Sequence, residues 1–270
     1  MGDLFIGLVT HPRTQYPHSA RDQGLFTQLS LTLADQDVIL NGHIESRNLL
    51  PSQHTFTEFE LSASRRHLLT LRKKWSLYCQ QGSIRRQKQQ LAFLRTRNTE
   101  PRSQEEARRL LNIEMAHVEL MNQAVAHDAE FSLILEDDAA SSSVCDLASD
   151  IVELIRREDS PFMAQISSSF SPRMLGIQKL IGAVERQWSN GGQEFRLLKP
   201  ATNTVCATIY RRDFLTTLLD AWSHQQPIPI VPVDWRLNEI LIALESAQQL
   251  PQGYSSIVFP GPIVQQSLES

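Results

Sequence analysis

The chain has 270 residues, of which 41% are hydrophobic and 21% are charged, and its formal net charge is -4. This composition excludes a disordered chain, and the length allows one large core, so we expect a single domain over residues 1–270. Its three cysteines, Cys79, Cys145 and Cys206, lie far apart without a CxxC pair, which argues against a disulfide framework or a zinc site and suits a reducing cytoplasm.

The N-terminal part begins with the apolar run 4–9, which predicts a first strand. The run is shorter than a signal peptide's apolar region and far below the roughly 18 residues of a membrane span, so we expect a soluble, cytoplasmic protein. Residues 19–34 favour a helix, although Leu29, Leu31 and Leu33 also alternate as they would in a strand. Residues 37–40 predict a second strand, and Thr55 with Glu58 fits a capping box that opens a long helix.

The central part shows the clearest pattern of the chain. Ser103 to Glu106 fits a second capping box, and apolar residues at helical spacing predict a helix that ends near His127. Phe131 to Leu135 is apolar at nearly every position, which predicts a strand buried on both faces. Three carboxylates, Glu136, Asp137 and Asp138, follow at its carboxyl end, where open α/β sheets bind ligands.

The C-terminal part continues the alternation of helices and strands. We predict a helix over 144–154, strands over 162–166, 204–210 and 255–259, and helices over 212–222 and 233–246. Residues 167–193 differ, because Asn190-Gly191 favours a hairpin turn, so we place a small antiparallel insertion there. The whole chain therefore predicts an α/β fold whose central sheet is mostly parallel and flanked by helices.

The row of three carboxylates needs a physical reason. Adjacent carboxylates repel one another by roughly 1 to 4 kcal/mol per close pair, unless a cation or a set of donors neutralises them. Oxygen ligands suit Mg²⁺ or Mn²⁺, which bind substrate phosphates through one or two protein carboxylates. The alternative is a solvated loop in which Asp138 caps the next helix. We favour the metal, because a buried strand precedes the triplet and the small residues 139–143 follow it.

The segment AHVELMNQAVAHDAEFSLILEDDA resembles the helix, strand and EDD motif of the family 25 glycosyltransferases, which include lipopolysaccharide sugar transferases and collagen galactosyltransferases. ATNTVCATIYRRDFLTTLLD and PVDW resemble two further segments of that family, so the likeness covers roughly residues 110–265. It implies a GT-A fold, with a nucleotide-binding half over 1–140 and an acceptor-binding half over 141–270. It also implies a nucleotide-sugar donor, for which we expect a UDP-sugar, a divalent metal and inversion at the anomeric carbon. The N-terminal part departs from the family, because the first strand leads into THPRTQYPHS rather than a short basic stretch.

The resemblance implies that Asp138 binds the metal and that Glu136 or Asp137 binds the metal or the nucleotide ribose. The loop after the first strand, with Thr10 and His11, would hold the nucleotide at the same edge of the sheet. Arg13 is the stronger candidate in that loop because its guanidinium can pair with phosphate oxygens. A loop histidine and a surface arginine without a ligand are the alternatives.

Inverting transfer needs a general base that accepts the proton of the attacking hydroxyl. Asp234 is our candidate, because it follows a proline-rich loop and matches the family's PVD segment, with Trp235 beside it as an apolar wall for a sugar ring. An ordinary helix N-cap is the alternative role for Asp234, and Glu239 or a residue of 167–194 is the alternative base.

Thirteen of the 26 Lys and Arg residues lie between Arg65 and Arg109. Such a run is usually a solvated helix face, but it could also contact a membrane surface peripherally. The leucine and tryptophan stripe of this helix is needed for the core, which leaves no broad apolar face for a bilayer. We expect no nucleic-acid partner, because the chain shows no zinc finger or aromatic RNA-binding signature.

The sequence therefore predicts a metal-dependent glycosyltransferase that moves a sugar to a hydroxyl of a glycan or another acceptor. A non-catalytic anion-binding protein on a degenerate transferase scaffold is the alternative from another class. A nucleotidyltransferase is a third reading, but it would be expected to carry a Gly-rich phosphate loop, and THPRTQYP is not one. Cys206 is interpreted as a small buried hydrophobe.

Overall fold

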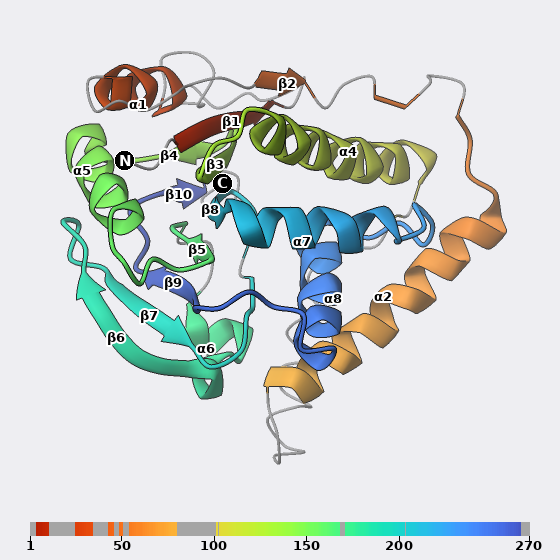
Figure 1. The fold of residues 1–270 in the computed structure, drawn as a ribbon. Coiled ribbons are helices and arrows are strands. Elements are labelled where there is room, and N and C mark those ends of the chain that lie inside the picture. The colour runs from red at the N-terminus through yellow and green to blue at the C-terminus, as the bar shows by residue number, and fades with distance from the viewer. Residues whose placement is uncertain are drawn as a thin grey trace.

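The computed structural model of the protein describes residues 4–10, 25–34, 43–45, 49–50, 54–79, 101, 103–167, 171–202 and 204–265. An eight-stranded sheet forms its centre, with the strand order β2-β1-β3-β8-β5-β9-β7-β6 (Figure 1). These strands are β1 (Leu4–Thr10), β2 (His43–Glu45), β3 (Phe131–Glu136), β5 (Met163–Gln165), β6 (Ile181–Gln187), β7 (Gln193–Leu197), β8 (Ala207–Arg211) and β9 (Ser255–Phe259). A separate pair consists of β4 (Ala139–Ala140) and β10 (Val264–Gln265).

Helices cover both faces of this sheet, as the predicted α/β class requires (Figure 1). On one face, Leu4, Ile6 and Leu8 of β1 belong to a core cluster with α1 and α5, while Phe5 and Val9 belong to a cluster with α4, α7 and α8 on the other. A continuous apolar run is what a strand buried on both faces needs. The helices are α1 (Leu25–Ala34), α2 (Glu58–Cys79), α4 (Gln104–Ala126), α5 (Val144–Ile155), α6 (Pro172–Leu175), the short 3₁₀ helix η1 (Gln178–Leu180), α7 (Arg212–Ser223) and α8 (Val233–Ser246).

The sheet is mixed, and the parallel pairing that we expected for most of it is limited to β1 with β2, β1 with β3, and β5 with β9. The other pairs are antiparallel, because β8 runs in the reverse direction between β3 and β5, and β6 and β7 form a hairpin. That hairpin is the predicted antiparallel insertion. It extends the main sheet, because β7 pairs with β9 along five residues.

The predicted hairpin turn is confirmed. Gly191 has a φ of +83°, a conformation that glycine adopts without steric cost, and Trp188 and Gly192 close the turn with a backbone hydrogen bond of 2.7 Å. The side chain of Asn190 supports it by accepting a hydrogen bond from the backbone N–H of Gly192 at 3.0 Å. The sequence signal Asn-Gly therefore placed this turn correctly.

The capping box of α2 lies two residues beyond the predicted one. Thr57, not Thr55, accepts a hydrogen bond through its hydroxyl from the backbone N–H of Glu60 at 3.2 Å, and the Glu60 carboxylate accepts one from Thr57 N at 2.6 Å. Both threonines precede a glutamate by three residues, so the local pattern alone could not separate them. The second predicted box is confirmed at α4, where Ser103 accepts from Glu106 N at 3.1 Å.

The remaining predicted elements match the structure with small shifts at their ends. Residues 25–34 are the helix α1 rather than a strand. The second strand predicted at 37–40 lies outside the described residues, and β2 follows at His43–Glu45. Within the part of the chain that the structure describes, none of the helices combines the length and the apolar character needed to cross a membrane.

Candidate metal centre

Three chain segments meet at the edge of the sheet where β1 and β3 end. These strands are parallel, and Val9 is in register with Glu136, so Thr10 and the EDD triplet leave the sheet at the same edge. β8 runs antiparallel to β3, with Leu135 opposite Ala207, so the chain enters β8 where β3 ends. Cys206, just before β8, therefore lies beside Glu136 and accepts a hydrogen bond from its backbone N–H at 2.9 Å.

The side chains of Glu136, Asp138 and Cys206 converge at this edge. Each offers one potential ligand atom, and the three atoms lie within 4.8 Å of one another. The Sγ of Cys206 lies 3.6 Å from Oδ1 of Asp138. Two ligands of one cation are separated by at most about 4 to 4.6 Å when their bonds are about 2.0 to 2.3 Å long. A small inward movement would therefore let all three bind a single divalent cation, and we call these residues the acidic cluster.

The acidic cluster is buried, although it consists of groups that prefer water. Glu136 is 8%, Asp138 7% and Cys206 0% exposed, and the neighbouring Asp137 is 1% exposed. The alternative of a solvated EDD loop therefore does not describe this structure. Ser143, not Asp138, caps the following helix α5, since its hydroxyl accepts a hydrogen bond from Asp146 N at 3.4 Å.

His117 of α4 contacts the cluster from behind. Its Nε2 lies 3.2 Å from Oε1 of Glu136, and the imidazole has no exposed surface. Burial lowers the pKa of His117 to about 4, although the carboxylate of Glu114 acts in the opposite direction. The imidazole is therefore neutral at pH 7, and a hydrogen bond to an accepting carboxylate oxygen needs the tautomer in which Nε2 carries the proton. His117 orients Glu136 without adding positive charge.

The thiol of Cys206 is protonated in the absence of a cation. Burial raises its pKa far above the ordinary range, and the negative charges of Asp138 and Glu136 raise it further. The S–H group donates to Asp138, so the thiol and the carboxylate are already aligned. A divalent cation would displace this proton, because a thiolate is the form that binds metals.

Cys206 is, with His117, one of the two residues of this site that the sequence interpretation missed. Its burial was predicted correctly, but its neighbours depend on the antiparallel pairing of β3 with β8, which was not expected. An apolar TVCATIY strand gives no local sign of the carboxylates beside it. Only knowledge that residues 131–135 pair with residues 207–211 could have placed Cys206 beside the carboxylates.

Of the predicted residues of the nucleotide loop, one is described by the structure and two are not. Thr10 is buried at the end of β1, at the edge where the cluster lies. His11 and Arg13 lie outside the described residues, so their predicted contact with a nucleotide stays a prediction. Of the small residues that follow the triplet, Ala139 and Ala140 form β4, which pairs with β10.

Asp234, the predicted base, lies half-buried in the first turn of α8. It is not the N-cap, which is Pro232. Asn238, one turn further along the same face, accepts a hydrogen bond from Thr202 N at 3.0 Å. The chain then leads from Thr202 through Thr204, whose hydroxyl accepts from Cys206 N at 3.2 Å. Asn238 of this helix therefore contacts Thr202, and Thr204 contacts Cys206 of the acidic cluster.

Two other predictions about α8 are corrected. Trp235 is 6% exposed and packs edge-on against Trp75 of α2, with ring centroids 6.3 Å apart, so it is a core residue and not the wall of a sugar site. Glu239, the alternative base, binds Arg236 at 3.0 Å and His67 at 2.9 Å. Burial acts to raise the pKa of Glu239, but these two partners outweigh it and lower the pKa, which makes Glu239 a poor proton acceptor.

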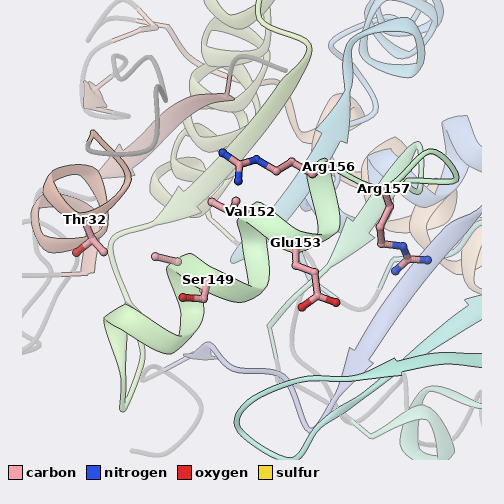
Figure 2. A pocket seen from close by; sticks show the side chains of 7 residues that line it. Thr32, Ser149, Val152, Glu153, Arg156 and Arg157 are labelled. Atoms are coloured by element: carbon pink, nitrogen blue, oxygen red, sulfur yellow. The ribbon is translucent and has the colours of Figure 1, made fainter. Parts of the chain in front are cut away.

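A pocket of about 560 Å³ lies away from the cluster, between α1 and the C-terminal half of α5 (Figure 2). Thr32 lines it from α1, while Arg156 and Arg157, at the end of α5, point in opposite directions. Arg157 is engaged by Glu194 at 3.1 Å. The residues that line this pocket include none of the acidic cluster, so the two are separate features.

Comparison with protein-family models finds none that matches this chain, and comparison with curated proteins finds no match either. The resemblance to the family 25 glycosyltransferases therefore depends on the three sequence segments that carry it.

Proposed function

We propose that the protein is a metal-dependent glycosyltransferase of the GT-A type that uses a nucleotide-sugar donor. The convergence of Glu136, Asp138 and Cys206 within 4.8 Å at the carboxyl ends of β1 and β3 is the observation that carries this proposal. The carboxyl ends of parallel strands are where open α/β sheets bind nucleotides. Burying two carboxylates beside a thiol without a cation is costly, and a bound cation offsets that cost.

The cation would be held by Asp138 and Glu136, and when bound it would offset the charge that develops on the departing nucleoside diphosphate. Mn²⁺ and Mg²⁺ are the metals expected from the carboxylates, and a UDP-sugar is the donor expected from the resemblance. His117 keeps Glu136 in place through its Nε2–H. Asp137 and the loop after Thr10 would contact the nucleotide.

Asp234 would act as the base. As the acceptor oxygen forms its bond to the anomeric carbon, the bond from that carbon to the diphosphate oxygen breaks, and the acceptor proton passes to the Asp234 carboxylate. Attack opposite the leaving group inverts the configuration of the anomeric carbon. The acceptor is a hydroxyl of a glycan or of another cellular molecule.

Thermal unfolding with UDP and Mn²⁺ or Mg²⁺ tests the binding step. A ligand at one hundred times its Kd stabilises the folded state by about 2.7 kcal/mol, which raises the Tm of a chain of this size by roughly 5 °C or more. Asp138→Asn should abolish the shift. Asp146→Asn is the matched control, because Asp146 is exposed in the first turn of α5 and should leave the shift unchanged. No shift in the wild-type protein, or an unchanged shift in Asp138→Asn, contradicts the proposal.

Slow metal-dependent hydrolysis of a panel of nucleotide sugars tests the activity without knowledge of the acceptor. We expect release of nucleoside diphosphate from one donor class, and its loss in Asp138→Asn. In Asp234→Asn, donor binding should persist while transfer to an acceptor falls by at least about a hundredfold, the usual contribution of a general base. A variant that transfers at the wild-type rate removes Asp234 as the base. Binding of anions without metal dependence or turnover would instead favour the non-catalytic protein.

The Cys206 thiol allows a separate prediction about which metal binds most tightly. Thiolate ligands prefer softer cations, whereas Mg²⁺ prefers oxygen ligands alone. Zn²⁺ and Mn²⁺ should therefore bind more tightly than Mg²⁺, and Cys206→Ser should weaken Zn²⁺ by more than it weakens Mg²⁺. Equal effects on all metals would show that Cys206 is a neighbour of the cation and not its ligand.

A further inference from the structure

The long helix α2 lies at the outside of the molecule and has two distinct faces (Figure 1). Its inner face carries Leu68, Leu71, Trp75 and Tyr78, all of which belong to a core cluster that α2 shares with Val231 and Trp235. This is the leucine and tryptophan stripe predicted to serve the core. Most side chains on the opposite face of α2 are exposed.

Large apolar side chains lie on that opposite face. Phe59 is 74%, Leu77 59% and Leu69 39% exposed. Phe59 and Leu77 are 18 residues apart, which is five full turns, so they point in the same direction at positions about 27 Å apart. The sequence interpretation did not anticipate them, because it assigned the apolar residues of this helix to the core alone. We define the outer face of α2 as Phe59, Ser62, Ala63, Arg66, Leu69, Thr70, Lys73, Lys74 and Leu77.

The charged residues of the outer face are all cationic. Arg66 and Lys73 lie between the apolar positions, Lys74 lies at the side toward Glu239 of α8, and the face as defined holds no Asp or Glu. The acids of the first turn point elsewhere, since Glu60 caps the helix at Thr57 and Glu58 binds Arg65 at 2.5 Å. The chain as a whole has a net charge of -4, so attraction to an anionic surface must come from a local patch such as this one.

We propose that the outer face of α2 binds the surface of an anionic lipid bilayer. A helix lying in a bilayer interface presents apolar side chains and cations on one face: the apolar groups enter the acyl boundary and the cations contact the headgroup phosphates. Nucleic acid would engage the cations but offers nothing to Phe59 and Leu77 at the two ends of this face. This surface is separate from the acidic cluster, and its role does not depend on the proposed activity.

Co-sedimentation of the full chain with vesicles tests the proposal. We expect binding to phosphatidylcholine vesicles that contain about one-third phosphatidylglycerol, and little binding to phosphatidylcholine alone. Arg66→Gln with Lys73→Gln should lower the partition coefficient about 25-fold, or roughly fivefold per basic residue. Phe59→Ser with Leu77→Ser should lower it about tenfold or more, because each removes apolar surface that would otherwise leave water. All four positions are exposed, so the variants should keep the wild-type Tm.

Matched controls come from exposed residues on other elements. Leu31→Ser on α1 with Leu198→Ser after β7 removes apolar side chains that are 67% and 69% exposed, and Arg109→Gln with Arg156→Gln removes two exposed charges. Both pairs should leave the partition coefficient within about threefold of wild type, less than the roughly fivefold effect of one basic contact. The proposal is overturned if the wild-type chain does not bind the anionic vesicles. It is also overturned if Phe59→Ser with Leu77→Ser binds the anionic vesicles like wild type. The outer face of α2 would then bind through its charge alone, as it would bind a nucleic acid.

Discussion

Two kinds of buried carboxylate lie within this fold, and their neighbours differ. Glu194 of β7 has no exposed surface and lies 3.1 Å from a guanidinium nitrogen of Arg157 and 3.1 Å from one of Arg186. In the acidic cluster, Glu136 contacts a neutral imidazole and Asp138 contacts a thiol. The first arrangement supplies cations from the chain itself, and the second presents potential metal ligands.

Glu114 of α4 repeats the first arrangement on the opposite side of the sheet. Arg236 of α8 lies 3.1 Å from its carboxylate, and Trp222 of α7 donates a hydrogen bond to it at 3.0 Å. These contacts join three helices around one buried charge. Arginine therefore neutralises the first kind of carboxylate within the fold, whereas we expect the cluster at the end of β3 to be retained at a cost to stability until a cation binds. Functional sites are where such costs are expected.

The largest effect should follow from breaking the pair at Glu114. Arg236→Met leaves the buried carboxylate of Glu114 without its cation and also removes the ion pair with Glu239, so it should lower the free energy of unfolding by about 3 to 5 kcal/mol. Urea unfolding of both proteins measures this difference. Adding Glu114→Gln to Arg236→Met removes the unpaired charge and should recover part of the loss. A loss below about 1 kcal/mol in the single variant would show that Glu114 is not held by its arginine, and the comparison would fail.

The dependence of stability on pH should show whether the buried imidazole of His117, beside Glu136, is neutral. The folded pKa of His117 is about 4 and its unfolded pKa is 6.5, so the unfolded chain binds the proton first. Stability is complete above about pH 6.5 and is lost as the pH falls toward 4, by about 3 kcal/mol for this one residue. The pKa of Glu114 is raised by burial, against the effect of Arg236, and it contributes with the opposite sign, because its folded form gains protons more readily.

The measurement is unfolding at several pH values with a chelator present, for the wild-type protein and His117→Gln. Glutamine can still donate to Glu136 but does not titrate, so the dependence of stability on pH between 4 and 6.5 should become shallower. Identical slopes for the two proteins would show that His117 does not remain neutral when buried.

Much of the fold followed from local patterns in the sequence. The buried strand 131–135, the helices that cover it and the Asn-Gly turn were all predicted, because apolar periodicity and turn residues report on their own segment. The direction of β8 and the joining of the hairpin to the main sheet were not, because strand pairing depends on contacts far apart in the sequence. The cap of α2 was placed at Thr55 instead of Thr57, since two overlapping motifs compete there.

The candidate site was predictable to the same extent. The EDD triplet stood out because like charges rarely cluster without a reason, and its position at the end of a buried strand followed from the pattern. Cys206 and His117 were not assigned to it, because each reaches Glu136 or Asp138 through a tertiary contact from another element. Trp235 was predicted to contact a sugar ring because it follows Asp234, the predicted base. In the structure it packs in the core against Trp75 of α2.

The smallest expected effect comes from neutralising one carboxylate of each kind and comparing the change in the free energy of unfolding. Asp138→Asn removes one of the clustered charges and keeps an oxygen that can accept from the Cys206 thiol, so without metal it should raise the free energy of unfolding by about 1 kcal/mol. Glu194→Gln makes the equivalent change beside Arg157 and Arg186 and should lower the free energy by about 2 kcal/mol, because two half-buried guanidinium groups each lose one charged, fully buried hydrogen-bond partner. Urea unfolding in the presence of a chelator gives both values. Changes of opposite sign would mean that the Glu194 carboxylate stabilises the fold, whereas the Asp138 carboxylate destabilises it when no metal is bound. A loss in both variants would make Asp138 a structural residue like Glu194 and remove the physical reason for placing a cation beside it.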